Sequence, residues 1–340
     1  MKTIKNILIL IFWLTLSQSQ EVKEIIIKGN EKTKDYIILR EIQHSIPGLY
    51  NSKIASEDEN RIYNLNLFSR VSIDSVDNQY VIDVAEKFYL FPFPIINYDE
   101  TTGTSYGAAI LNLNFRGRDE TIAGGLIKGN TDQYFLYYLN PWVYGDHISI
   151  GFQYENLLHR HHAYEIIDNS NIFELFSGFY IGNNHKFKLI SGYETHQLNN
   201  LGFEYKYWNT RIVYKYDSRD IYLDPTKGML LNFKINNRIG IDKTENIYQF
   251  EFDGNSYISI INDYPNPVIK YRCKIYLQQS RENIPLFYKE YLGGYELVKG
   301  YSMIPSENDK GEKRFEVDNY FFQSVALQGT VIPRAIHLSL

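Results

Sequence analysis

The sequence has almost no cysteine, no long apolar run after its N-terminus and no excess of positive charge. Among 340 residues the only cysteine is Cys273, which excludes an internal disulfide and any zinc site built from several cysteines. Beyond the first 20 residues, no stretch approaches the roughly 18 apolar residues of a transmembrane helix. The formal net charge is −5, so no basic field favours nucleic acid as a partner.

Motifs for covalent chemistry are also missing. The chain contains no Gly-x-Ser-x-Gly, no His-Glu-x-x-His and no phosphate-binding glycine-rich loop. His159, His161 and His162 are close enough in sequence to offer imidazole ligands to a metal, but their place at the end of an expected strand favours a surface position. We therefore predict no catalytic residue, no metal and no cofactor, and a protein that is not an enzyme.

Aromatic residues, by contrast, are abundant. The chain has 30 tyrosines and 20 phenylalanines, yet its mean hydropathy is only −0.35. An aromatic-rich but hydrophilic chain is typical of a transmembrane β-barrel, in which lipid-facing apolar residues alternate with a polar lumen. A large soluble β-protein rich in tyrosine is the alternative that composition leaves open.

The first 20 residues have the pattern of a secretory signal. Lys2 and Lys5 form a basic start, residues 7–16 are apolar, and Ser17 and Ser19 provide a small-x-small cleavage pattern. The apolar segment is too short to span a bilayer, which disfavours a membrane anchor. We predict a signal peptide over residues 1–20 and export of the rest.

Residues 21–87 are expected to form a small α/β domain. Alternation and helical spacing predict a strand, two helices and two further strands, in that order, over residues 22–28, 33–46, 56–65, 71–73 and 80–84. Ser56 and Glu59 are spaced as a capping box for the second helix. This order, with the motifs Gly29-Asn30-x-x-Thr33 and Leu65-x-Leu67-Phe68-Ser69-x-Val71, resembles a POTRA (polypeptide-transport-associated) domain. A generic small α/β domain is the alternative.

Only strand patterns follow residue 88. Proline at positions 92 and 94 disfavours a central strand and marks the entry to the new region. Apolar and polar residues then alternate in many segments, such as residues 148–154, 212–216, 231–235 and 271–277. A membrane strand with its connections uses roughly 20 residues, so residues 88–340 predict a mainly β, antiparallel transmembrane barrel of about 12–13 strands.

Two motifs in this region resemble the BamA/TamA-like outer-membrane assembly superfamily. The first is an Asp-x-Arg-Asp…Pro-x-x-Gly hairpin, formed here by Asp217, Arg219, Asp220, Pro225 and Gly228. A charged turn followed by proline and glycine predicts a tight return between two strands. An ordinary salt-bridged hairpin would have the same local pattern, but the motif precedes the second motif in the family's order.

The second motif is a loop of residues Gly293, Gly294, Val298, Lys299, Gly300 and Tyr301. It resembles the inward-folded Val-Arg-Gly-Phe/Tyr loop of the same superfamily, with lysine in place of arginine. Lysine is a point charge and cannot form the two-pronged contact that arginine makes with a carboxylate. We expect Lys299 to contact an acidic group in the lumen, with Arg314 and Glu316 as candidate electrostatic partners around the loop.

The resemblance covers essentially residues 21–340 and implies a function. It implies a factor for outer-membrane protein assembly or insertion, located in the outer membrane with its POTRA domain in the periplasm. The implied partners are membrane lipids, unfolded outer-membrane protein clients bound by the POTRA domain, and accessory lipoproteins. A two-partner-type secretion pore, a truncated inactive remnant and, more remotely, a soluble enzyme are the alternatives. Because the superfamily's barrels have about 16 strands, we also expect a C-terminally short, open barrel.

Overall fold

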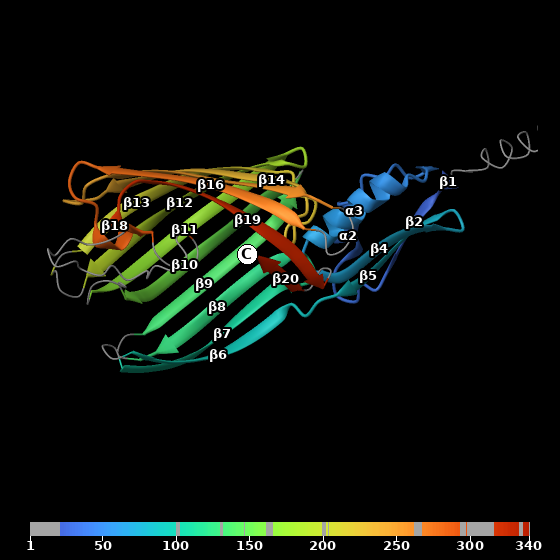
Figure 1. Cartoon of the computed structure of the whole chain (residues 1–340). Coiled ribbons are helices and arrows are strands. Elements are labelled where there is room, and N and C mark those ends of the chain that lie inside the picture. Colours follow the sequence, from blue (N-terminus) through green and yellow to red (C-terminus); the bar gives the residue numbers. More distant parts are fainter. Residues whose placement is uncertain are drawn as a thin grey trace, which may run out of the picture. The chain divides into compact units, whose positions relative to one another are not determined.

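The computed structural model describes residues 21–99, 103–129, 132–145, 147–160, 166–198, 202, 204–261, 267–292, 297, 316–332 and 336–339 (Figure 1). The chain divides into two compact units, of which the first comprises residues up to Tyr89 together with Arg116–Asp119. The second contains Leu90–Phe115 and the chain from Glu120 onward.

The first unit has the α/β composition expected of its sequence. Its elements are β1 (Glu21–Val22), β2 (Glu24–Lys28), α2 (Asp35–Leu39), β3 (Gly48–Leu49), α3 (Ser52–Asn64), β4 (Phe68–Val76) and β5 (Gln79–Glu86). Strands β2, β5 and β4 form a sheet in that order, with β2 parallel to β5, whereas β1 pairs with β3. Asp77 and Asn78 both have positive φ in the turn between β4 and β5, as the Asp-Asn pair predicts.

Both predicted helices differ from the structure in their bounds. The first was predicted over residues 33–46, but α2 ends at Leu39 and the following residues form turns, before the chain reaches Pro47. The second begins at Ser52, because Asn51 caps it by accepting hydrogen bonds from the amides of Lys53 and Ile54. The predicted capping box at Ser56 and Glu59 is therefore wrong, since Ser56 lies inside α3.

A buried carboxylate organises the interior of the first unit. Asp58 on α3 is completely buried and accepts hydrogen bonds from the amides of Gln43 and His44. It also accepts a 2.8 Å bond from the phenol of Tyr80 and pairs with Arg61. These contacts satisfy a charge that would otherwise be costly to bury. Asp58 thereby links α3 both to strand β5 and to the turn after α2.

Among the described residues, the second unit is dominated by one antiparallel sheet of 13 strands (Figure 1). Its strands are β6 (Leu90–Asp99), β7 (Gly103–Phe115), β8 (Glu120–Lys128), β9 (Gln133–Tyr144), β10 (Ile148–Arg160), β11 (Ile167–Ile181), β12 (His185–Leu198), β13 (Glu204–Asp217), β14 (Gly228–Gly240), β15 (Ile247–Ser259), β16 (Val268–Ser280), β19 (Tyr320–Ile332) and β20 (Ile336–Ser339). The strand number and the antiparallel barrel class agree with the sequence prediction. Between β16 and β19 lie a 3₁₀ turn η1 (Leu286–Tyr288) and the short strands β17 (Glu290–Tyr291) and β18 (Glu316–Val317).

The pairing order gives the sheet two ends. In the described residues, β6 pairs with β7 alone and β20 with β19 alone, and no ladder joins β6 to β20. In the described part of the chain the sheet is therefore not closed by pairing of its first and last strands, as expected for an open barrel.

No helix among the described residues is long and apolar enough to cross a membrane.

Candidate functional site

The predicted hairpin motif forms a compact charged turn between β13 and β14. Arg219 makes a two-pronged contact with the buried Asp217, with nitrogen–oxygen distances of 2.8 and 2.9 Å. Asp220 accepts bonds from the amide and hydroxyl of Thr226 at 3.0 and 2.6 Å. The structure thus brings the charged motif residues together, and each carboxylate has its own partner.

Two residues without charge shape the same hairpin. Pro225 is buried and immediately precedes Thr226. Gly228 has φ +97°, and a Cβ there would lie 2.2 Å from the carbonyl oxygen of Ser218. Only glycine fits both the left-handed backbone and this close approach. The motif's glycine is therefore required by geometry, as the sequence predicted for a turn.

The loop stem, which we define as residues 284–291, lies against one face of the barrel sheet. The phenol of Tyr288 donates a 2.6 Å hydrogen bond to Glu194 on β12. The guanidinium of Arg238 on β14 lies 4.1 Å from the centre of the Tyr288 ring, and Phe287 stacks on His196 at 4.2 Å. We call the sheet face that receives the stem the inner face and the opposite face the outer face.

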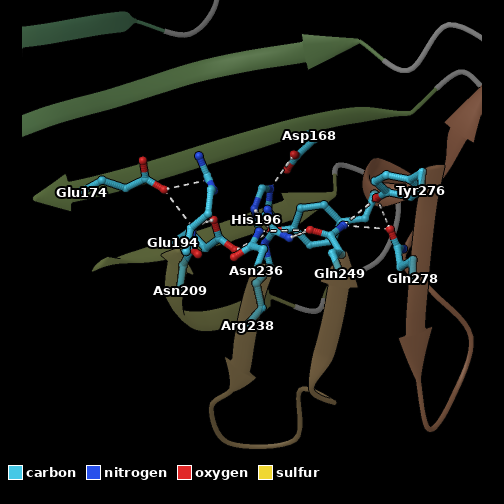
Figure 2. A network of polar contacts seen from close by, with 12 residues as sticks. Asp168, Glu174, Glu194, His196, Asn209, Asn236, Arg238, Gln249, Tyr276 and Gln278 are labelled. Carbon is cyan, nitrogen blue, oxygen red and sulfur yellow. Dashed lines mark hydrogen bonds and ion pairs between the residues drawn. The ribbon is translucent and has the colours of Figure 1, made fainter. Parts of the chain in front are cut away.

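Charged and amide side chains line the inner face of β11 to β16. Arg238 bonds Glu194 at 2.6 Å, and Arg211 bonds Glu174 at 3.2 Å. Asn209 donates to both of these glutamates. Figure 2 shows the side chains of Glu174, Glu194 and Asn209 close together on neighbouring strands. From Arg238 the network continues through Gln249, Tyr276 and Gln278. Alternating inward positions therefore build one connected polar wall.

A cavity of about 300 Å³ beside these contacts is lined by residues of both the loop stem and the polar wall. Four cations and two carboxylates line it: Arg211, Lys234, Arg238, Lys289, Glu251 and Glu290. Lys234 pairs with Glu251 at 3.2 Å, so part of this charge is compensated across adjacent strands. The contacts of Phe287 and Tyr288 therefore hold the stem on the polar wall, and the cavity lies next to these contacts.

The inner face of β6 to β9 has a different character. The strand pairing from β13 back to β6 shows which residues of β6 to β9 share the inner face with the stem contacts. In the middle of these strands they are twelve: Phe91, Phe93, Ile95, Gly107, Ala109, Leu111, Ala123, Gly125, Ile127, Phe135, Tyr137 and Leu139. None of them is charged. The Phe135 ring lies over Gly125, where an added Cβ would be 2.5 Å from it. We call this surface the apolar wall.

The outer face is apolar along nearly the whole sheet. Ile96 is 84% exposed, Val325 72% and Leu126 64%. Stacked aromatic pairs also cross the strands on this face, including Phe179 with Phe187 and Tyr214 with Phe233. An exposed apolar band of this kind suits a lipid environment.

Comparison with known families agrees with this architecture. Residues 114–327 match the Omp85 superfamily domain, which is more than half of the chain. The chain belongs to the Omp85 superfamily. Residues 20–87 match the POTRA family, described as the surface antigen variable number repeat. Members of the Omp85 superfamily are outer-membrane β-barrel proteins that act in transport or assembly.

Solved structures support the Omp85 fold. The chain is similar to BamA from Haemophilus ducreyi lacking POTRA domains 1–3, with 17% identity and a TM-score of 0.52, covering 91% of this chain and 67% of that one. It is also similar to CdiB from Escherichia coli, with 9% identity and a TM-score of 0.50, covering 92% of this chain and 62% of that one. CdiB from Acinetobacter baumannii matches with 16% identity and a TM-score of 0.49, covering 93% and 62%. No curated protein matches the chain significantly.

All six residues of the predicted loop motif, and Arg314, fall outside the described part of this Omp85 chain. Gly293, Gly294, Val298, Lys299, Gly300, Tyr301 and Arg314 all lie there. The backbone of Glu316 pairs with Tyr291 in the ladder between β17 and β18. The two strands therefore close the base of the loop, while the proposed contact of Lys299 stays a prediction.

The polar wall and the stem residue Tyr288 were not predicted. Glu174, Glu194, His196 and Arg238 are polar residues in three strands with ordinary alternation, β11, β12 and β14. Their inward position follows from the alternation, but their pairing depends on register. One sequence signal pointed to Tyr288: it lies close before the glycine pair of the loop motif, which begins at Gly293.

Proposed function

We propose that this Omp85 protein assembles β-strand proteins and inserts them into the outer membrane, with its POTRA domain in the periplasm and without catalysing a covalent reaction. The observation that carries the proposal is the apolar wall beside the sheet end at β6. An unpaired strand edge is a template for another strand, and backbone groups must be paired before they enter lipid. A client strand arriving at this edge would meet apolar surface on both faces.

The POTRA domain supplies a second strand edge. Strand β2 ends the sheet β2-β5-β4, so it is available to receive an extended client segment by strand addition. Lipids would contact the apolar outer face of the barrel, and accessory lipoproteins are further partners that the family resemblance implies. None of these interactions requires a nucleotide or a metal.

A secretion pore of the two-partner type is the second candidate, and the polar wall favours it. A soluble client carries polar groups that need a hydrated path, which the charged inner face of β11 to β16 would offer. The apolar wall is less suited to this task, because a polar client would lose hydration against it. The two functions therefore assign different roles to the two walls.

The proposal can be tested with the purified chain in lipid vesicles. We expect it to accelerate conversion of an unfolded outer-membrane β-barrel protein into its heat-resistant folded form. Ala109→Lys, which places a charge on the apolar wall, should slow this conversion, while Asn232→Lys on the polar wall should not. Heat-resistant migration of each variant on a gel would confirm that it is folded.

Two results would contradict the proposal. If the vesicles export a soluble client but do not accelerate client folding, the secretion pore is favoured. If Ala109→Lys and Asn232→Lys have equal effects, the contrast between the walls has no role in the function.

A further inference from the structure

A continuous chain of polar contacts links the loop stem to two barrel strands. Nδ1 of His196 on β12 lies 2.7 Å from Oδ2 of Asp168 on β11. Nε2 of the same ring lies 3.1 Å from the phenol oxygen of Tyr288, and that phenol is 2.6 Å from Oε1 of Glu194. Both Asp168 and His196 are buried. Three consecutive contacts thus run from Asp168 through His196 and Tyr288 to Glu194.

These three contacts together require a proton on each ring nitrogen of His196. Asp168 as a carboxylate only accepts, so Nδ1 of His196 must carry a proton. Tyr288 has one proton, which it donates to Glu194. The contact between Tyr288 and Nε2 then needs a second proton on the ring. A neutral imidazole would leave two lone pairs facing each other at 3.1 Å.

The surrounding charges place this additional proton on His196. Arg238 on β14 donates to the same oxygen of Glu194 at 2.6 Å, which favours the ionised form of Glu194 over a carboxylic acid. Among the described residues, Oδ1 of Asp168 has no hydrogen-bond partner, and Oδ2 of this carboxylate contacts His196. Tyr207 on β13 and Phe287 also contact the ring, and neither brings a charge. One imidazolium and one guanidinium thereby balance two carboxylates.

We propose that His196 is a proton-dependent positioning residue for the loop stem. In its doubly protonated form it joins Asp168 to Tyr288 and holds residues 284–291 against the polar wall. Loss of the proton breaks the contact with Tyr288 and leaves a net negative charge among the four groups, which loosens the stem. The stem leads into the segment that carries Lys299, so this contact fixes the position from which that segment starts. The inference does not depend on which client the protein handles.

Hydrogen exchange of the full chain in detergent micelles tests the proposal. The amides of Tyr288 and Lys289 are bonded to the carbonyls of Pro285 and Leu286, so their exchange reports the stem directly. We expect their protection, corrected for the intrinsic effect of pH, to fall on the order of tenfold between acidic and alkaline conditions. Tyr288→Phe keeps the ring but should remove this pH dependence. His196→Phe should leave the stem weakly protected at every pH.

A matched control lies on the same strand. His185 is on the outer face of β12, where it contacts the Tyr214 hydroxyl at 2.9 Å, so His185→Phe should behave as the unmodified protein. Nitrogen-15 NMR of labelled histidine should also show one ring with both nitrogens protonated near neutral pH, absent in His196→Phe. The proposal is overturned if wild-type protection is independent of pH, if His185→Phe has the same effect, or if no such imidazolium is found.

Discussion

Tyr288 and Glu194 are 94 residues apart in the sequence, and their hydrogen bond is 2.6 Å long. Glu194 also holds Arg238, whose side chain is only 10% exposed. One carboxylate therefore joins the loop stem to strand β14 as well as to its own strand. This relationship makes Glu194 the residue at which the stem and the polar wall are most directly coupled.

Replacement of Glu194 by glutamine should destabilise the barrel strongly. It leaves the buried Arg238 without its charge partner, a loss that costs about 3–5 kcal/mol in comparable buried pairs. The temperature at which heat-resistant migration disappears should fall accordingly. Glu204→Gln is the control, because its pair with Lys206 is exposed and contributes roughly 0–1 kcal/mol. Equal effects of the two substitutions would contradict the stabilising role of the buried pair between Glu194 and Arg238.

Gly228→Ala should disrupt the charged hairpin. The added Cβ would meet the Ser218 carbonyl oxygen at 2.2 Å in a backbone with φ +97°. Backbone strain of this kind costs of the order of 1–3 kcal/mol, and the clash adds to it. Gly182→Ala is a sharp comparison, because its φ is +59° but no atom lies within 4 Å of the added Cβ. Denaturant unfolding should show the larger loss for Gly228→Ala.

Residues 21–87 should fold without the barrel. This segment contains a set of fully buried apolar side chains: Val22, Ile37, Ile62, Phe68 and Ile82, each with no exposed surface. Expressed alone, the segment should show a cooperative thermal transition by circular dichroism. The segment does lose a contact to the turn at residues 116–119, where Gly117 accepts a bond from Lys34. A broad, non-cooperative melt would show that the proposed domain boundary is wrong.

The same segment should lose stability in alkali. Burial, and then the hydrogen bond to Asp58, raise the pKa of Tyr80 well above its usual range. A pKa that is higher in the folded than in the unfolded state gives a contribution that is complete below about pH 10 and is lost above it. Each pH unit above that point should lower the free energy of unfolding by up to about 1.4 kcal/mol. Tyr80→Phe should be less stable at neutral pH but should show a flatter alkaline profile.

Lys299 is expected to anchor the loop through an acidic group in the lumen. Lys299→Ala should then impair loop docking, with a cost of about 3–5 kcal/mol for a buried pair, while Lys299→Arg should be tolerated or bind better. Accessibility of a thiol placed at Val298 would report docking in each variant, once Cys273 is replaced. A fully accessible Lys299 with no carboxylate nearby would end this hypothesis.

Strand alternation is a local property, and it predicted the barrel region well. Alternation at residues 212–216 implies opposite faces for successive residues, and the structure has Arg211 against Glu174 while Ile212 is 53% exposed. Helix bounds were harder to predict. Periodic isoleucines suggested a helix to residue 46, but α2 stops at Leu39 because the segment that follows forms turns leading into Pro47. The cap at Asn51 was missed in favour of a capping box inside α3.

The sequence by itself determined the POTRA domain, the family, the number of strands and the hairpin at Asp217, since local motifs, alternation and chain length are enough for them. Only the tertiary structure decided which inward residues meet. Strand register brings together Asp168, His196, Arg238 and Tyr288 from four segments, and a shift of one residue would turn each strand's partners to the opposite face. The division into a polar and an apolar wall has the same origin. Alternation along one strand decides the face on which a residue lies, but the pairing of strands decides which residues become its neighbours on that face.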